Sequence, residues 1–120
     1  MDTNAIAASY FELWGTTDDA RRHELATTLF AADAVHHAAP ADVHFEGIEA
    51  IEANITRVNT ENIQKAGVTF HEGDVRPNHD AIQVEWSVAA PNGKTVGTGR
   101  DFLFINDEGK IIKLYMFNGV

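Results

Sequence analysis

The spacing of apolar residues changes once along the chain, near Gly67. Before that point, apolar residues recur at intervals of three and four, which is the period of a helix with one buried face. The pattern predicts three helices: one that ends near Gly15, a second capped by residues 17–19, and a third between Gly47 and Gly67. Their buried residues are expected to be Ile6, Tyr10, Leu13 and Trp14, then Leu25, Leu29 and Phe30, and finally Ile48, Ile51, Ile55, Val58 and Ile63.

After Gly67, apolar residues alternate with polar ones, which is the period of a half-buried strand. Residues 32–46, between the second and third helices, are expected to form a short strand and then a loop. Helices followed by a run of hairpins predict the α+β class, with the helices packed on one face of a strongly bent antiparallel sheet. Turns rich in Pro, Asn, Asp and Gly separate the four long strands that the alternation predicts, over residues 68–75, 82–88, 95–105 and 111–117.

Composition and charge narrow the choice of partners. A chain of 120 residues with 44% hydrophobic and 22% charged residues is expected to form one globular domain with a sizeable core. The absence of Cys excludes disulfides and a Cys-based zinc site. A net charge of −9 repels phosphate backbones and anionic lipid, so we expect neither nucleic acid nor a membrane as a partner. No pattern of a signal peptide or a transmembrane helix is present, and we expect a cytoplasmic protein.

Four segments are similar to segments that recur in the nuclear transport factor two-like superfamily, and most of all in its SnoaL-like and ketosteroid-isomerase-like members. They are residues 8–14 (ASYFELW), 29–35 (LFAADAV), 45–51 (FEGIEAI) and 102–111 (FLFINDEGKI). The resemblance covers nearly the whole chain. It implies a single SnoaL-like domain over residues 1–120, cone-shaped, with three N-terminal helices on a strongly curved antiparallel sheet and a pocket at the wide end of the cone.

The resemblance also implies residues for the site. Ketosteroid isomerases place three groups in this pocket: a carboxylate base after the short first strand, a tyrosine on the first helix, and a protonated aspartate on a late strand. Tyr10 matches the tyrosine and Asp101 matches the aspartate, whereas the position of the base falls on Ala38. The missing base argues against steroid-type isomerisation by the same mechanism.

Asp101 is the strongest catalytic candidate on its own chemistry. Strand alternation places it on one face with Gly97 and Gly99, and the two glycines are expected to leave room for a ligand. An acid among small and aliphatic neighbours loses hydration, which raises its pKa. The alternative is an aspartate at a bulge or an edge that pairs with Arg100 or Lys94.

The histidines offer a second candidate. His36 and His37 face opposite ways on a strand, and His37 shares its face with Val35. We therefore expect His37 to be either an acid or base in the pocket or a half-buried histidine bonded to the backbone. Tyr10 has a similar alternative, a core tyrosine whose hydroxyl reaches the surface.

The remaining expectations concern the ligand. A catalytic metal is not expected, because His37, His44 and His71 lack a ligand spacing typical of metal sites. No nucleotide or phosphate-binding motif is present, so we expect no cofactor. The residues expected to line a mostly apolar substrate pocket are Trp14, Ile55, Trp86, Leu103, Phe117 and His71, although both tryptophans are more often core residues.

These observations predict an enzyme that acts without a cofactor on a small apolar carbonyl compound, as an isomerase, cyclase or dehydratase, with Asp101, His37 and Tyr10 as its catalytic residues. One alternative is a hydrophobic-ligand-binding or dimerisation domain without turnover. A minor one is an epoxide hydrolase, because the adjacent Arg100 and Asp101 resemble the Arg and Asp pairing of limonene epoxide hydrolases; the two residues would need a bulge to face the same pocket. We expect a homodimer through the sheet, because both faces near Phe102 and Phe104 are apolar.

Overall fold

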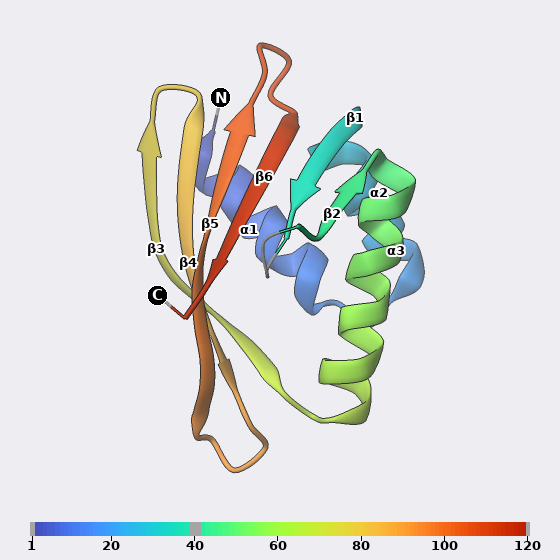
Figure 1. Cartoon of the computed structure of the whole chain (residues 1–120), viewed down its shortest axis with the longest axis vertical. Helices are drawn as coiled ribbons and strands as arrows, with labels where there is room; N and C mark the ends of the chain where they lie inside the picture. Colours follow the sequence, from blue (N-terminus) through green and yellow to red (C-terminus); the bar gives the residue numbers. More distant parts are fainter. Residues whose placement is uncertain (1, 39–41, 120) are drawn as a thin grey trace.

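The chain folds into a six-stranded sheet that wraps around helices on one face, in a computed structural model that describes residues 2–38 and 42–119 (Figure 1). The strand order is β2-β1-β6-β5-β4-β3, and all neighbours are antiparallel except β1 and β6. The elements are α1 (Thr3–Gly15), α2 (Asp19–Leu29), β1 (Phe30–His37), β2 (His44–Glu46), α3 (Ile48–Val58), the π-helix η1 (Asn59–Lys65), β3 (Thr69–Asn78), β4 (Ala81–Ala89), β5 (Thr95–Ile105) and β6 (Ile111–Asn118).

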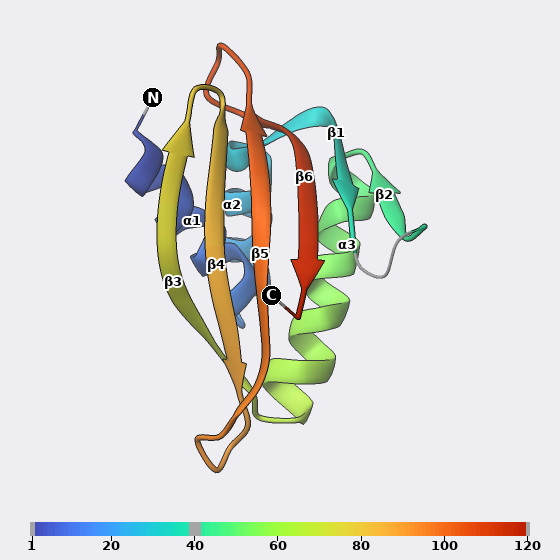
Figure 2. The same ribbon diagram turned by 60° about the vertical axis from the view of Figure 1, so that its left-hand side comes forward.

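The predicted α+β architecture is confirmed. The sheet is curved and not closed, and α1 and α2 lie against its inner face while α3 runs along the side formed by β1 and β2 (Figures 1 and 2). Asp2 and Asp18 cap the first two helices by accepting hydrogen bonds from backbone N–H groups of the first turn. No helix in the described part of the chain is long and apolar enough to cross a membrane.

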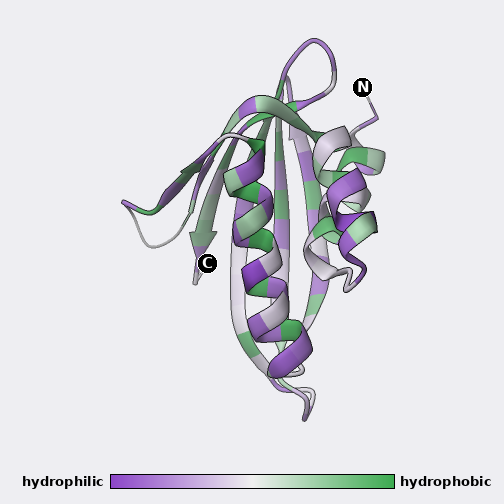
Figure 3. Cartoon of the chain, turned by 90° about the vertical axis from the view of Figure 1, so that its right-hand side faces the viewer, coloured by the Kyte–Doolittle hydropathy of each residue, from purple (hydrophilic) through white to green (hydrophobic). Residues whose placement is uncertain are grey.

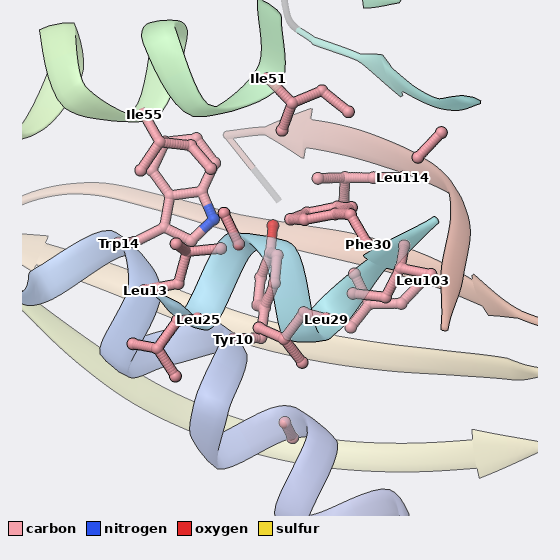
Figure 4. Packing of buried hydrophobic residues seen from close by; sticks show 14 of the residues in the cluster. Tyr10, Leu13, Trp14, Leu25, Leu29, Phe30, Ile51, Ile55, Leu103 and Leu114 are labelled. Atoms are coloured by element: carbon pink, nitrogen blue, oxygen red, sulfur yellow. The ribbon is translucent and has the colours of Figure 1, made fainter. Parts of the chain in front are cut away.

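The core lies between the helices and the inner face of the sheet. Tyr10, Leu13 and Trp14 project from α1 toward α3 and the sheet, and Ile51 and Ile55 meet them from α3 (Figure 4). The hydropathy colouring of α3 shows apolar and polar residues interleaved along the helix, as a helix with one buried face requires (Figure 3). Burying this apolar surface is the main source of stability of the fold.

Two local predictions are wrong. Phe30 begins β1 instead of ending the second helix, and the predicted loop contains the short strand β2, whose Phe45 lies opposite His36. The third helix continues as η1, in which the side chain of Asn59 donates to the carbonyl of Trp14 over 2.9 Å. Asn59 also accepts from the buried Arg22 over 3.3 Å. These tertiary hydrogen bonds tie η1 to the end of α1, and a pattern of apolar residues contains no trace of them.

A bulge in β3 changes which residues face inward. Between Glu72 and Val75 the register against β4 shifts, so that Phe70 lies opposite Val88 and Val75 opposite Val84. Both Phe70 and Val75 pack against the core despite their odd spacing. Strand alternation alone therefore fails along β3.

Candidate active site

Asp101 lies on the inner face of β5 and is almost completely buried, with 2% of its surface exposed. Tyr10, from α1, donates its hydroxyl hydrogen to Oδ2 of Asp101 over 2.5 Å. Trp86, from β4, donates its indole N–H to Oδ1 over 2.9 Å. The face predicted for Asp101 from alternation is confirmed, and neither Arg100 nor Lys94 pairs with it.

Burial raises the pKa of Asp101 from its ordinary value of 3.8 to about 6, while the hydrogen bonds from Tyr10 and Trp86 act in the opposite direction. The pKa of Tyr10 is raised well above its ordinary value of 10.0 by its own burial and then by the neighbouring carboxylate. The Tyr10 hydroxyl therefore remains a donor at neutral pH. The carboxyl group, in contrast, changes its charge within two pH units of neutrality.

The contact between Trp86 and Asp101 depends on the glycine at position 99. A Cβ atom at Gly99 would lie 2.1 Å from Cζ2 of Trp86 and 2.7 Å from the carbonyl oxygen of Phe117, so only glycine lets the indole lie this close to the backbone. The expectation that Gly99 leaves room for a ligand is therefore wrong, because Trp86 fills that space. At Gly97 the nearest atom to a Cβ would be 4.0 Å away, in Val88.

The two adjacent histidines lie on opposite faces, but the inward one is His36. His36 is fully buried, whereas His37 stacks on Tyr115 on the outer face, with ring centroids 4.4 Å apart. The expectation that His37 faces the pocket is wrong, and the reason is Val35. This residue is apolar but lies on the outer face with His37, while Ala34 takes the inward position.

The His36 ring is buried without a partner. Neither of its nitrogens has a hydrogen-bond partner among the residues that the structure describes, and the same holds for Nε1 of Trp14. The two rings meet edge to face, with centroids 5.9 Å apart. Burial, and then the nearby His37, lower the pKa of His36 from 6.5 to about 4, so the imidazole is neutral at pH 7. The Trp14 indole slightly opposes the rise in the pKa of Tyr10, although its N–H makes no hydrogen bond of acceptable geometry.

These groups open onto one pocket of about 280 Å³ between α1, the α3–η1 helix and the inner face of the sheet. Asp101, Tyr10, Trp14, His36 and Trp86 all lie in its wall. The other lining residues are mostly apolar: Phe11, Ala38, Val43, Phe45, Asn54, Arg57, Val58, Asn62, Phe70, Val88, Met116 and Asn118.

The predicted substrate-binding residues divide into three groups. Trp14 and Trp86 line the pocket as expected. Ile55 and Leu103 do not, because they are fully buried in the core behind it. Phe117 and His71 lie on the outer face.

Phe117 is 51% exposed and packs edge to face on Phe102. His71 lies opposite Ser87, and its Nε2 is 2.8 Å from the Thr69 hydroxyl. The bulge that follows His71 explains the error for this residue. It turns Val75 inward and leaves His71 outside.

The described residues also test the readings based on other chemistries. No group of three His, Cys, Asp or Glu side chains in residues 2–38 and 42–119 converges in a way that could hold a metal ion. Arg100 faces outward, where its Nε lies 3.4 Å from Glu85, so it does not share the pocket with Asp101. Ala38, which the sequence resemblance aligns with the base of the ketosteroid isomerases, lines the pocket, and Asp101 is the one carboxylate among the described lining residues.

Comparison with known proteins agrees with this architecture. The SnoaL-like domain profile matches residues 7–114, and the chain therefore belongs to the SnoaL-like domain family, within the nuclear transport factor two-like (NTF2-like) superfamily. No curated protein matches the sequence.

Solved structures of similar fold include a candidate isomerase of the SnoaL-like family from Agrobacterium tumefaciens strain C58. That protein is 25% identical, with a TM-score of 0.85, over 98% of this chain and 97% of the other. A candidate polyketide cyclase from Sinorhizobium meliloti is 20% identical, with a TM-score of 0.69, over 93% of both chains. An NTF2-like protein of unknown function from Exiguobacterium sp. 255-15 is 22% identical, with a TM-score of 0.74, over 94% and 97% of the two chains.

Proposed function

We propose that this protein is an enzyme that works without a cofactor and removes a proton next to the carbonyl group of a small, mostly apolar compound. The observation that carries the proposal is the environment of Asp101. Its carboxyl group is buried in the pocket wall, and burial raises its pKa to about 6. A pKa near the working pH is what a general acid or base requires. Isomerisation, aldol-type cyclisation and dehydration all begin with such a proton transfer.

Asp101 fits the role of a base better than that of a hydrogen-bond donor. Both of its oxygens accept hydrogen bonds, from Tyr10 and Trp86, which favours the ionised form. With a pKa of about 6, most molecules carry the carboxylate at pH 7. Tyr10 and Trp86 hold the carboxylate in place and keep its pKa from rising further.

His36 and Trp14 supply the complementary group. As Asp101 takes the proton, the electrons of the C–H bond move onto the carbonyl oxygen, which becomes an enolate. The donors proposed for that oxygen are the N–H groups of Trp14 and of the neutral His36 ring, which have no partner among the described residues; because both nitrogens are buried, the rings must turn toward the ligand as it binds. Return of the proton from Asp101 to another carbon completes an isomerisation. In a cyclisation the enolate carbon instead attacks a second carbonyl of the substrate, and the oxygen of that carbonyl takes the proton from Asp101. His36 thus takes the place in the pocket that the sequence assigned to His37, but as a hydrogen-bond donor and not as an acid or base.

The family supports this class of reaction without specifying the substrate. The SnoaL-like relative from A. tumefaciens is a candidate isomerase, and the structure from S. meliloti is a candidate polyketide cyclase. One observation favours a second function, a ligand-binding domain without turnover: Ala38 stands in the pocket wall where ketosteroid isomerases have their base. Proton transfer by Asp101 distinguishes the two.

The experiment measures exchange of the protons next to the carbonyl group of small ketones in D2O by NMR. We expect the protein to accelerate exchange and Asp101→Asn to slow the catalysed rate by about 100-fold or more, as is typical for loss of a general base. Asp107→Asn, in the turn between β5 and β6, is the matched control and keeps full activity. Binding of ketones without catalysed exchange would favour the ligand-binding function.

The predicted homodimer remains a proposal about the outer face. There Phe104 packs edge to face on Tyr115, beside the pair formed by Phe102 and the half-exposed Phe117. Covering such a surface with a second copy removes it from water. Sedimentation at micromolar concentration is expected to give a dimer, and a monomer would contradict the proposal.

A further inference from the structure

The helical wall of the pocket carries a set of hydrogen-bond donors that proton transfer at Asp101 does not use. Asn54, Arg57 and Asn62, from α3 and η1, all line the pocket. Asn54 is 93% buried by surface area, being 7% exposed, whereas Arg57 and Asn62 lie at the solvent side. Asn62 lies on the same wall as Asn54 and Val58, because residues four and eight apart share one face of a helix.

The Arg57 guanidinium is held in place at this wall. Its Nη2 donates to Oδ1 of Asn54 over 2.7 Å, and its Nη1 donates to Oε2 of Glu61 over 3.2 Å. These contacts use two of its five N–H groups and orient the plane of the group. The Nδ2 of Asn54 donates to none of the residues that the structure describes. The wall thus offers free N–H donors, and Arg57 is its one charged side chain among the described residues that line the pocket.

Charge selects the chemistry of the ligand. Among the described lining residues, Arg57 is the one basic side chain and Asp101 the one acidic side chain, because His36 is neutral at pH 7. A cation at an apolar pocket is unusual in a chain with a net charge of −9. The donors of a guanidinium and an amide match a carboxylate, whose two oxygens accept side by side. A phosphate, with nearly two charges, would meet a single cation here.

We propose that the ligand carries a carboxylate, which binds Arg57 and Asn54 while the carbonyl and apolar body of the ligand occupy the rest of the pocket. The natural substrate class is then a small keto acid with an apolar body. That the ligand is a substrate rests on the proposed function, whereas the carboxylate site does not. The site stands if the protein only binds.

Glu61 provides a second test, because its charge is expected to weaken binding of an anion, whereas that of Arg57 strengthens it. Its carboxylate already pairs with Nη1 of Arg57, and both side chains are more than half exposed. It therefore repels an incoming carboxylate and competes for the same guanidinium. Removing the charge of Glu61 is expected to tighten binding of an anion and to leave binding of a neutral analogue unchanged.

The test compares the affinity of matched ligands that differ only in charge: 4-oxopentanoate, 4-oxo-4-phenylbutanoate and 4-oxo-4-(2-naphthyl)butanoate, each against its methyl ester. Binding is measured by calorimetry and by ligand-observed NMR at low salt, because an exposed ion pair is weakened by salt. We expect at least one acid to bind about tenfold more tightly than its ester, the effect of one charge-assisted hydrogen-bonded pair. Equal affinity within every pair, or no binding of any acid, would overturn the proposal.

Variants assign the preference to Arg57. Arg57→Gln is expected to abolish the difference between acid and ester, and Glu61→Gln to increase it. Arg57→Lys is expected to restore part of the difference. Arg76→Gln, at an exposed arginine of β3 outside the pocket, is the matched control and leaves it unchanged. A preference that survives Arg57→Gln would overturn the assignment.

The two proposals fail in different ways. Preferred binding of an acid without catalysed proton exchange would leave the carboxylate site intact and remove the enzymatic function. Catalysed exchange with equal rates and affinities for acids and esters would support the enzymatic function and remove the carboxylate site.

Discussion

Two walls of the pocket treat their buried polar groups in opposite ways. On the sheet wall, both oxygens of Asp101 accept hydrogen bonds from the protein. On the wall near β1, His36 and the Trp14 indole are equally buried, yet their nitrogens have no partner among the described residues. A buried polar group without a partner costs stability. The fold itself satisfies the polar groups of the first wall, whereas those of the second are left without partners, which is why we propose that a ligand binds them.

The largest expected effect concerns the pH dependence of stability, because the two walls shift pKa values in opposite directions. The folded pKa of Asp101, about 6, exceeds its ordinary 3.8, so its contribution to stability is fully present below about pH 4 and is lost as the pH rises through 6. The folded pKa of His36, about 4, lies below its ordinary 6.5. Its contribution is present above pH 6.5 and is lost as the pH falls through 4. In the wild type the two nearly cancel.

Single variants uncover each slope. Between pH 4 and 6.5 we expect the free energy of unfolding of Asp101→Asn to rise by about 3 kcal/mol relative to the wild type, at 1.36 kcal/mol for each pKa unit. For His36→Phe we expect it to fall by about the same amount relative to the wild type. Urea unfolding at a series of pH values measures both. If the free energies of unfolding of both variants, relative to the wild type, did not change with pH, the opposite pKa shifts of Asp101 and His36 would be contradicted.

A smaller effect is expected from the glycine that lets Trp86 reach Asp101. Gly99→Ala places a methyl group where the indole lies, and we expect a loss of about 2 kcal/mol in the free energy of unfolding, typical of an overpacked site. Displacing Trp86 also removes a hydrogen bond that lowers the pKa of Asp101, so that pKa is expected to rise above 6. Gly97→Ala, with open space at its Cβ, is the control for both measurements. Equal stability of the two variants would show that Trp86 does not depend on Gly99.

The smallest effect on stability is expected when His36 and His37 are each replaced by Phe. The two variants are also expected to differ in activity. His36→Phe replaces unpartnered nitrogens with carbon, and we expect it to raise the stability at pH 7 by about 1 kcal/mol. The same variant is expected to slow proton exchange about tenfold, through loss of one donor to the enolate oxygen. His37→Phe keeps the stacking on Tyr115 and changes neither property by much. A fully active His36→Phe would remove the donor role.

The sequence predicted the three helices, the four long strands and the inward face of Asp101, because all of these depend on periodicity alone. It failed where tertiary contacts override the period. The bulge in β3 reversed the orientation expected for His71, and an apolar residue on the outer face of β1 led to the wrong histidine. The pairing of Asp101 with Tyr10 joins residues 91 positions apart, and local spacing says nothing about such a contact.

Arg57 and Asn62 were missed for a different reason. They are polar residues on the solvent side of a helix, where charged side chains are expected in any globular protein. Nothing in the helical pattern distinguishes them from neighbours such as Glu52. Their place in the pocket wall is visible only in the folded structure. The hydrogen bond from Asn59, in η1, to the Trp14 carbonyl is likewise a contact between residues distant in sequence.

The central claim is that the buried carboxyl group of Asp101 titrates close to neutral pH. The most direct measurement is the NMR titration of the Asp101 side-chain carboxyl carbon in the ¹³C-labelled wild type, assigned by the signal that Asp101→Asn removes. The account predicts a midpoint at about pH 6. A midpoint at the ordinary value near 4 would contradict it, because the group would then be too weak a base for the chemistry proposed.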